Sequence, residues 1–360
     1  MCFLFDKRAN QCYFYRNTIV KISHEELFIM KKIRILIAGY GNVGRGVVAA
    51  LKRNPDMELA GIISRSPERV AKEVTDVPVL SYDDVAGFLG LKADVAILCG
   101  GSKNDLPVQG PRMAQYMNTV DSFDNHSKVP EYFHSMDEAA KKGCHVSVIS
   151  TGWDPGIFSL ERTLANAFLP GSRAYGFYGL GPKGGLSMGH SDALRTIPGV
   201  VDARQFTHAI PEALDKVRNG ENPVFTPGDM HTRECFVVAA PDADKAAIEK
   251  TIKEMPGYFA PYQTVVNFIS QEELNEKYKG FPHDGTVAAA GVTGDGNSAR
   301  IEYRCVWGSN PEATASVLVA HARAAARLFD EGKKGAYTIL DIPPAYFSAH
   351  DREELLARWI

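Results

Sequence analysis

The stretch "IRILIAGYGNVGRG", residues 33–46, decides the fold class. Its first part is a short apolar run that is typical of a buried strand, and the residues after Gly44 have the small and apolar spacing of a helix. Between them, Gly39, Gly41 and Gly44 have the G-x-G-x-x-G spacing of a loop that binds the pyrophosphate of a dinucleotide. The first glycine allows a sharp turn, the second lets the backbone approach the pyrophosphate, and the third lets the helix pack on the strand. A cluster of helix-capping glycines is the alternative, but the flanking strand and helix favour the dinucleotide loop.

A second apolar run, "MELAGIIS" at residues 57–64, ends where such a fold positions the ribose of the cofactor. NAD-dependent enzymes usually carry an acidic residue there, whereas this chain has Ser64, Arg65 and Ser66. A carboxylate would repel a 2′-phosphate, but the Arg65 guanidinium can bind one through two N–H groups, and the serines can donate hydrogen bonds. The sequence therefore predicts NADP as the cofactor; the alternative is a solvated turn with an incidental arginine.

The rest of the chain predicts an α/β fold with a Rossmann-type doubly wound parallel sheet and a second, α+β domain. Apolar runs alternate with helical segments up to about residue 150, and strand-like runs with few helices then predict a mostly antiparallel sheet. Asn310 as N-cap, Pro311 in the first turn and Gly332 as terminator predict a long helix that packs back on the first domain. The expected parts are an N-terminal extension at 1–29, the NADP-binding Rossmann domain at 30–153, a second domain at 154–305 and a C-terminal segment at 306–360.

Composition excludes several classes of function. The chain has 360 residues, 45% of them hydrophobic, and a formal charge of -3, so it has no basic surplus for nucleic acid or acidic membranes, and a small-molecule substrate fits better. The six cysteines form no CxxC pair, which argues against a zinc site or a disulfide framework and favours the cytoplasm. No apolar run approaches the roughly 20 residues of a membrane span. Residues 1–29 lack the features of a secretory signal, and Met30 is an alternative native start.

Three carboxylates follow apolar strands, at the edge where open parallel sheets bind ligands. They are Asp105 in "CGGSKND", Asp124 in "VDSFDNH" and Asp154 in "STGWDPG". For Asp105, helix capping is at least as good an interpretation as a functional role. Asp124 and Asp154 could converge on one small volume, although the residues alone favour an Asx-turn or a cap for each of them.

Six segments resolve this choice: "GYGNVGRG", "TVDSFDNH", "STGWDPG", "MGHSDALRTIPGV", "CFVVA" and "FPHDG". In this order and at this spacing, the chain from Met30 to its C-terminus resembles the meso-diaminopimelate dehydrogenases, a family of NADP-dependent amino acid dehydrogenases of lysine biosynthesis. The resemblance implies hydride transfer from the D-configured carbon of meso-diaminopimelate to NADP, with L-2-amino-6-oxopimelate and ammonia as products. It also implies a homodimer formed through the second, substrate-binding domain, and no metal.

The same resemblance assigns residues. Asp124 and Asp154 match two carboxylates around the reacting amine, and Arg233 matches an arginine that pairs with the distal carboxylate of the substrate. Negative charge beside the amine stabilises the cationic imine, and a carboxylate or its bound water can accept the ammonium proton; either aspartate fits either role. Further pocket residues are Thr207, His283 and Asn310 at the distal end, Trp153 and Tyr178 as walls, and the backbone of Met188 and Gly189. The predicted cofactor-binding residues are Gly39, Tyr40, Gly41, Asn42, Val43, Gly44, Ser64, Arg65, Ser66, Cys99, Gly100, Gly101, Ser102, Ser122 and Phe123.

One departure from the family concerns the loop "GLGPKGG" before "GHSD", which carries extra glycines and Lys183, while Tyr178 replaces the Trp or Phe of relatives. A looser pocket that accepts other D-amino acids is therefore an alternative to strict specificity. The His-His segment of dihydrodipicolinate reductases and the Glu-Lys-Pro segment of glucose-fructose oxidoreductases are absent from the sequence. A catalytically silent NADP-binding sensor is the alternative from another class, but it would not need both aspartates and Arg233.

Overall fold

The computed structural model describes residues 5–6, 11–12 and 32–360, and the chain divides into two compact units, Met1–Lys32 and Ile33–Ile360. The first unit contains two short strands, β1 (Phe5–Asp6) and β2 (Gln11–Cys12), which pair antiparallel. The expectations about the extension and about a start at Met30 fall on residues that lie almost entirely outside the described part. The second unit carries the fold and the site.

The predicted doubly wound parallel sheet is present, and its described strands lie in the order β16-β8-β7-β6-β3-β4-β5. All neighbouring pairs run parallel. The chain order reverses between β3 and β6, so the carboxyl ends of these strands form the crevice in which such sheets bind ligands. The strands are β3 (Ile33–Ala38), β4 (Met57–Ile63), β5 (Val79–Leu80), β6 (Val95–Leu98), β7 (Asn118–Asp121), β8 (Val146–Val148) and β16 (Gly335–Tyr337). The helices between them are α1 (Asn42–Leu51), α2 (Pro67–Ala71), α3 (Val85–Gly90), α4 (Leu106–Ala114) and α5 (Val129–Gly143), with a 3-10 turn η2 at His126–Lys128.

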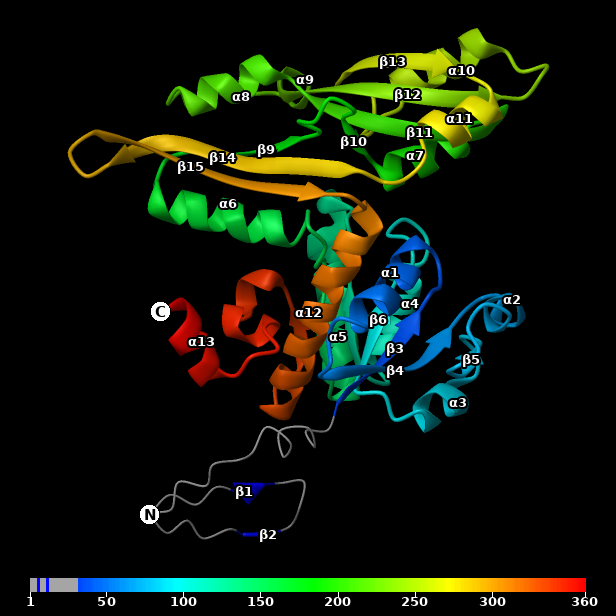
Figure 1. The fold of residues 1–360 in the computed structure, drawn as a ribbon, viewed down its shortest axis with the longest axis vertical. Coiled ribbons are helices and arrows are strands. Elements are labelled where there is room, and N and C mark those ends of the chain that lie inside the picture. The colour runs from blue at the N-terminus through cyan, green and yellow to red at the C-terminus, as the bar shows by residue number, and fades with distance from the viewer. Residues whose placement is uncertain (1–4, 7–10, 13–31) are drawn as a thin grey trace. The chain divides into compact units, whose positions relative to one another are not determined.

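Helices cover both faces of this sheet (Figure 1). Ile35 and Ile37 of β3 belong to the same buried cluster as Leu318, whereas Leu36 belongs to the cluster on the other face with Met113 of α4. Successive residues of a strand point to opposite faces, so a strand that is covered on both sides must be apolar throughout. This is why "IRILIA" is a continuous apolar run rather than an alternating one.

Helix α12 (Asn310–Asp330) contacts α1 and strands β6, β7 and β8 of the parallel sheet. Figure 1 shows it running from the end of β15 along that sheet. The prediction of Asn310 as its N-cap is wrong, because Ser309 in extended geometry takes that position and Asn310 is the first helical residue. The Asn310 side chain is thereby free to point at the pocket. Gly332 follows the helix with a φ of 80°, as expected for a terminator.

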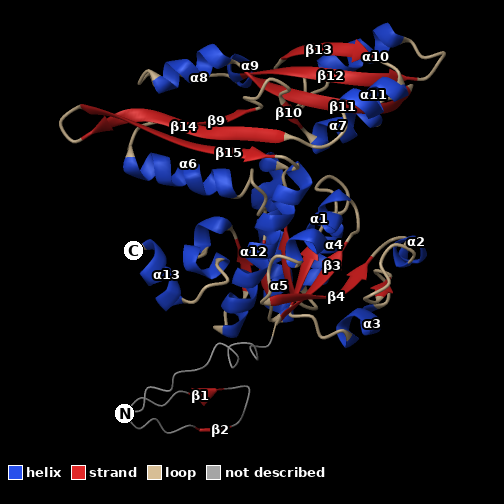
Figure 2. Cartoon of the chain, viewed as in Figure 1, coloured by secondary structure: helices blue, strands red, loops and turns tan. Residues whose placement is uncertain are grey.

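Between β8 and α12 the chain forms two further sheets rather than one (Figure 2). The first, in the order β15-β14-β9, is antiparallel, and the second, in the order β10-β11-β12-β13, contains one parallel pair, β12 and β13. Helix α10 lies between β12 and β13 in the chain and returns it in the same direction, so this one pair is parallel within sheets that are mostly antiparallel, as predicted. The strands are β9 (Ala174–Tyr178), β10 (Gly185–Leu186), β11 (Val200–Ala209), β12 (His231–Ala239), β13 (Gln263–Phe268), β14 (His283–Thr293) and β15 (Asn297–Trp307). The helices are α6 (Ile157–Phe168), α7 (Met188–Arg195), α8 (Pro211–Arg218), α9 (Pro227–Met230), α10 (Lys245–Glu254) and α11 (Gln271–Lys277).

The end of the chain returns to the parallel sheet. Strand β16 pairs with β8, and the 3-10 turns η3 (Ile339–Asp341) and η4 (Pro344–Phe347) and helix α13 (Arg352–Trp359) follow it. The sequence did not predict β16, because "GAY" is too short to carry a periodic signal. Among the described helices, none is long and apolar enough to span a membrane.

Candidate active site

The glycine loop has the geometry of a phosphate cradle. Gly39 has a φ of 105°, in the region that favours glycine. A Cβ on Gly44 would collide with the carbonyl oxygen of Gly39, whereas a Cβ on Gly41 would find no atom within 4 Å. Helix α1 begins directly after Gly41, and no side chain caps its N-terminus. The first-turn N–H groups are therefore available to an anion, and the loop, which also contains the predicted residues Tyr40, Asn42 and Val43, fits a pyrophosphate.

Arg65 lies just past the end of β4, where the fold delivers the ribose. Its side chain is 74% exposed, and its Nη1 lies 3.1 Å from Oδ1 of Asp105. The turn is fixed locally, because Ser64 Oγ accepts a hydrogen bond from the N–H of Ser66 at 3.0 Å. The guanidinium is thus exposed at the place predicted for a 2′-phosphate.

Arg65→Ala should raise the Kd for NADP by about tenfold to a hundredfold, because it removes charge-assisted hydrogen bonds to the 2′-phosphate. The Kd for NAD, which lacks this phosphate, should change by less than about twofold. Fluorescence titration of the protein with each dinucleotide measures both constants. Arg69→Ala, which removes the same charge from the exposed surface of α2, is the matched control. Equal weakening of both dinucleotides by Arg65→Ala would contradict the assignment.

Asp121, the last residue of β7, forms hydrogen bonds with the segments that follow β7 and β8. Its Oδ1 accepts the N–H groups of Phe123 and Ser150 at 3.0 and 3.1 Å, and its Oδ2 accepts the Tyr132 hydroxyl at 2.8 Å. The side chain is fully buried, and burial raises its pKa to about 6 although the three hydrogen bonds lower it. One buried carboxylate therefore holds the two loops that carry Asp124 and Asp154. The sequence analysis missed Asp121, although "TVDS" places an acidic residue within a buried strand.

Asp124 lies on an exposed loop next to the predicted cofactor residues of the β6 loop. Its N–H donates to Ser102 Oγ at 3.0 Å, while its side chain makes no hydrogen bond or ion pair with any described residue. The preceding residue, Phe123, is buried and stacks on the ring of Tyr132. On the neighbouring β6 loop, burial raises the pKa of Cys99 to about 12, so this thiol stays protonated. The loop thus presents an unpaired carboxylate beside the crevice. The other predicted cofactor-binding residues of this region are Gly100 and Gly101 after β6 and Ser122 after β7.

Asp154 is held in a different way. Its side chain is 7% exposed, and Arg162 of α6 binds both oxygens, with Nη1–Oδ1 and Nη2–Oδ2 distances of 2.8 and 3.0 Å. The Tyr178 hydroxyl donates to the same Oδ2. Burial and the Asp154 charge hold the pKa of Tyr178 well above its ordinary value, so its hydroxyl remains a donor. The Asp154 side chain is therefore not an Asx-turn acceptor but a fixed anion, and Arg162 is a site residue that the sequence analysis missed.

Tyr178→Phe should lower kcat/KM for the amino acid substrate by about tenfold, because it removes one hydrogen bond to a charged group that positions Asp154. Arg162 remains bonded to both oxygens, so the fold should be retained. Steady-state kinetics measure the effect. Tyr175→Phe removes a hydroxyl that contacts Asn222 outside the pocket and serves as the control. An unchanged kcat/KM in Tyr178→Phe would remove this hydroxyl from the site.

Trp153 connects the two sides of the pocket. Its indole Nε1 donates to Oδ1 of Asn310 at 2.9 Å, and Asn310 Nδ2 donates to the carbonyl of Leu186 at 3.3 Å. The ring of Trp153 packs edge-on against His283 and Tyr178, with centroid distances of 4.6 and 5.9 Å. Burial lowers the pKa of His283 to about 4, so this histidine is neutral at pH 7. Four predicted wall and distal residues thus form one contiguous group around the indole.

Arg233 forms the cationic end of the site. It lies opposite Thr207 in the β11–β12 pair, its Nη1 donates to Thr207 Oγ1, and its guanidinium lies 4.0 Å from the ring centroid of Tyr262. The residue is 8% exposed, its Nε has no hydrogen-bond partner, and no carboxylate of the described residues forms an ion pair with it. Burial lowers the pKa of Arg233. A buried cation without an anion is costly, so the arrangement calls for an anionic ligand.

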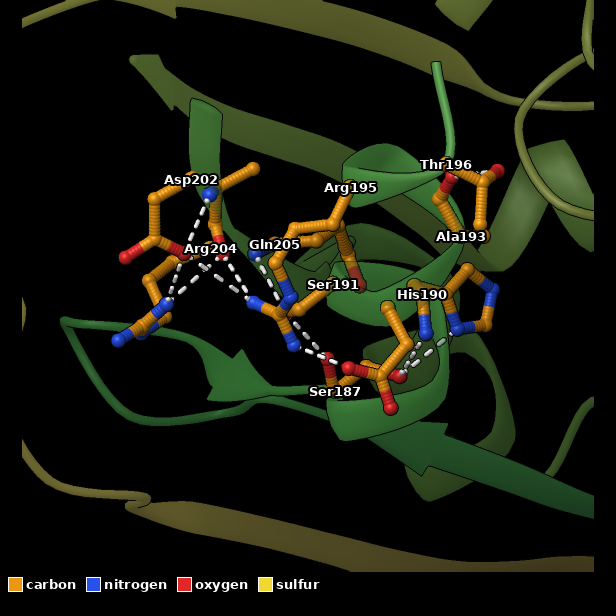
Figure 3. Close-up of polar contacts among 11 residues, drawn as sticks. Ser187, His190, Ser191, Ala193, Arg195, Thr196, Asp202, Arg204 and Gln205 are labelled. Atoms are coloured by element: carbon orange, nitrogen blue, oxygen red, sulfur yellow. Dashed lines mark hydrogen bonds and ion pairs between the residues drawn. The ribbon is translucent and has the colours of Figure 1, made fainter. Parts of the chain in front are cut away.

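Hydrogen bonds join the N-terminal turn of helix α7 to strand β11 (Figure 3). Met188 and Gly189 are the first two residues of this helix. Ser187 Oγ accepts the N–H of His190 at 3.3 Å, and Ser191 Oγ donates to the Ser187 carbonyl and accepts the N–H of Gln205. The Gln205 side chain in turn donates to Thr207 Oγ1 at 3.3 Å. A Cβ on Gly189 would find no atom within 4 Å, so a ligand can approach the backbone there.

The structure does not bring every predicted residue together. No hydrogen bond or ion pair between described residues joins Asp124 to Asp154. The glycine-rich loop before "GHSD" is held at its base, because Oδ1 of Asp284 accepts the N–H groups of Leu180 and Gly181 at 2.9 and 3.4 Å. The exposed Lys183 on this loop has no role in the contacts of the pocket.

Comparison with known proteins agrees with this site. A family model described as "Diaminopimelic acid dehydrogenase C-terminal domain" matches residues 152–309. The meso-diaminopimelate D-dehydrogenase of Acetivibrio thermocellus is 50% identical over 91% of this chain and 97% of its own length. That of Corynebacterium glutamicum is 43% identical over 91% of this chain and 99% of its own length. The chain belongs to the meso-diaminopimelate D-dehydrogenase family.

Solved structures of a diaminopimelate dehydrogenase and of an engineered D-amino acid dehydrogenase have the same fold. A crystal structure of the C. glutamicum diaminopimelate dehydrogenase in complex with diaminopimelate superposes with a TM-score of 0.86, at 42% identity, and covers 92% of this chain and 100% of the other. An engineered D-amino acid dehydrogenase bound to NADP+ superposes with a TM-score of 0.83, at 41% identity, over 91% and 100% of the two chains. The predicted family and fold class are therefore confirmed.

Proposed function

We propose that this chain catalyses the reversible, NADP-dependent oxidative deamination of the D-configured centre of meso-2,6-diaminopimelate, a step of lysine biosynthesis. The amino acid, NADP+ and water give L-2-amino-6-oxopimelate, ammonium, NADPH and a proton. Membership of the meso-diaminopimelate D-dehydrogenase family supports the reaction, and the NADP+ complex of a 41% identical relative supports the cofactor.

The residues of this chain fit NADP. The open space at Gly41, the uncapped start of α1 and the exposed guanidinium of Arg65 offer sites for the pyrophosphate and for the 2′-phosphate. When bound, the nicotinamide accepts the hydride that leaves the substrate carbon.

A single observation carries the substrate assignment: the buried guanidinium of Arg233 has no carboxylate partner among the described residues. Arg233 is buried without an anion, and Asp154 is a fixed carboxylate whose neighbour Trp153 bonds to Asn310. A substrate that fits has a carboxylate at one end for Arg233 and a reacting amine at the other. Meso-diaminopimelate, with an amino acid head at each end, satisfies both requirements.

The two aspartates suit different tasks. Both oxygens of Asp154 are bonded by Arg162, and Oδ2 also accepts the Tyr178 hydroxyl, so this carboxylate suits a fixed negative charge beside the cationic imine. Asp124 is exposed and its side chain has no described partner, so it suits the transfer of the ammonium proton to water. The amine must lose that proton before its carbon can release a hydride.

A spectrophotometric assay tests the proposal. Meso-, LL- and DD-diaminopimelate are added separately to the protein with NADP, and NADPH formation is followed at its absorbance maximum. The meso isomer should be turned over and the LL isomer should not, because the LL isomer has no D-configured centre. Absence of turnover with the meso isomer would overturn the proposal, and comparable turnover with D-alanine would favour the broader D-amino acid dehydrogenase.

We further propose that residues 30–153 bind NADP, that residues 154–305 bind substrate and form a homodimer in the cytoplasm, and that residues 306–360 are a C-terminal segment that packs back on the NADP-binding domain. Apolar side chains that the hairpin β14–β15 exposes, such as Val292 and Val306 at 56% and 68%, support a partner at this region. Sedimentation at micromolar concentration tests the dimer, and a monomer would overturn it.

A further inference from the structure

The contact between Arg65 and Asp105 has a consequence for the cofactor. We propose that Asp105 sets the strength of the preference for NADP over NAD, because its carboxylate competes with the 2′-phosphate for the Arg65 guanidinium. This inference rests on the proposed cofactor site, and it assigns a specificity role to a residue for which the sequence favoured helix capping at least equally.

The carboxylate is fixed while the arginine is exposed. Asp105 precedes helix α4 and is 21% exposed; its Oδ2 accepts the N–H of Gly101 at 3.0 Å, and its Oδ1 faces Arg65. Gly100 leaves room for it, since a Cβ there would lie 2.8 Å from the Cβ of Asp105. The Asp105 side chain makes no capping hydrogen bond to α4. Its two oxygens are therefore directed at the two cofactor-binding elements, the β6 loop and Arg65.

The ion pair opposes a phosphate in two ways. Asp105 occupies the Nη1 edge of the guanidinium at 3.1 Å, so a 2′-phosphate must share or displace that hydrogen bond. The carboxylate would also repel a dianion that binds the same guanidinium, because two negative charges would then share one cation. NAD carries a neutral hydroxyl at this position, so it neither competes with Asp105 for the guanidinium nor is repelled by its charge.

Stability does not account for the pair. An ion pair with an arginine that is 74% exposed contributes little to the free energy of folding, because the solvent screens it. Asparagine at position 105 keeps an oxygen for the Gly101 N–H and removes only the charge and the acceptor that faces Arg65. Asp105→Asn is thus a substitution with a local and predictable effect.

The experiment measures dinucleotide binding without amino acid substrate, because Ser102 of the same loop also contacts the backbone of Asp124. Isothermal titration of the full chain gives Kd values for NADP, NAD and adenosine 2′-phosphate. In Asp105→Asn the Kd values for NADP and for adenosine 2′-phosphate should fall by about fivefold, and that for NAD should stay within about twofold. In the Arg65→Ala background the same substitution should give less than half of this gain in binding free energy.

Glu58→Gln is the matched control. Glu58 forms an ion pair with Arg34 at the amino ends of β3 and β4, which is the opposite end of the sheet from the glycine loop, so its neutralisation should leave all three constants unchanged. If Asp105→Asn does not fold, as reported by the loss of NAD binding, Asp105→Ser makes the same test.

An unchanged or raised Kd for NADP in a variant that still binds NAD would overturn the inference. It would mean that Asp105 either has no influence or orients Arg65 for the phosphate. An equal gain for NADP in Glu58→Gln would also overturn it, since the effect would then be one of net charge. Failure of the proposed function is distinguishable, because it would appear as absent turnover by the wild-type protein whatever the Asp105 variants bind.

Discussion

Asp154→Asn should lower kcat for meso-diaminopimelate by about a thousandfold and leave the Kd for NADP unchanged. The substitution keeps the shape of the side chain but removes the negative charge that would face the cationic imine, and preorganised groups of this kind contribute factors of about 10² to 10³ each. The residue lies past β8 rather than in the glycine loop, so cofactor binding should not depend on it. Single-turnover absorbance of NADPH and fluorescence titration with NADP measure the two effects.

Asp202→Asn is the matched control for this experiment. Asp202 also forms ion pairs with arginines, Arg195 and Arg204 (Figure 3), but it lies at the start of β11, and none of these contacts involves Asp154. Its neutralisation should leave kcat within about twofold. A kcat of Asp154→Asn near that of the wild type would remove Asp154 from the mechanism. A Kd for NADP that rises in parallel with the loss of kcat would indicate a general loss of structure instead.

Arg233→Leu should raise KM for meso-diaminopimelate by about a hundredfold or more, with a smaller effect on kcat. Removal of one member of a buried charge pair costs about 2–5 kcal/mol of binding, and here the second member is the distal carboxylate of the substrate. The free protein should become more stable, since a buried cation without an anion is replaced by an apolar side chain. A rise in Tm together with the rise in KM distinguishes a binding residue from a structural one.

Two controls sharpen this result. If the protein turns over D-alanine, which has no distal carboxylate, KM for that substrate should be insensitive to Arg233→Leu. Arg204 pairs with Asp202 on β11, the strand next to the one that carries Arg233. Arg204→Leu should leave KM unchanged. A decrease in Tm and an unchanged KM in Arg233→Leu would show that Arg233 supports the fold and not the substrate.

The sequence predicted those parts of the site whose positions follow from local pattern. The G-x-G-x-x-G loop depends on backbone conformations that glycine provides, and the buried strands before Asp124 and Asp154 place both residues at the ligand-binding edge. Arg233 lies near the start of β12 with no local signal, and only the resemblance to a family assigned it a role.

The missed residues depend on contacts between segments that are far apart or that share an ordinary surface pattern. Arg162 occupies one face of an amphipathic helix, where an arginine is usually solvated, and its pairing with Asp154 depends on the angle at which α6 leaves the turn. Tyr262 meets Arg233 only because β13 runs parallel to β12 after a helical crossover. Asn310 was predicted as a pocket residue, and only its additional assignment as the helix cap was wrong, because the backbone of Ser309 provides the extended geometry that a cap requires.

Strand β16 and helix α12 have a consequence for the order in which the chain is synthesised. The segment that contains β3 to β8 leaves the ribosome first, yet the edge of β8 is paired by residues 335–337, and the apolar face around Ile35 and Ile37 is covered by Leu318. Until the last few dozen residues emerge, the nascent parallel sheet has an unpaired edge and a face that α1 covers only in part, which are features that promote association with other chains. The first half of this protein therefore completes its fold only after translation of the second half.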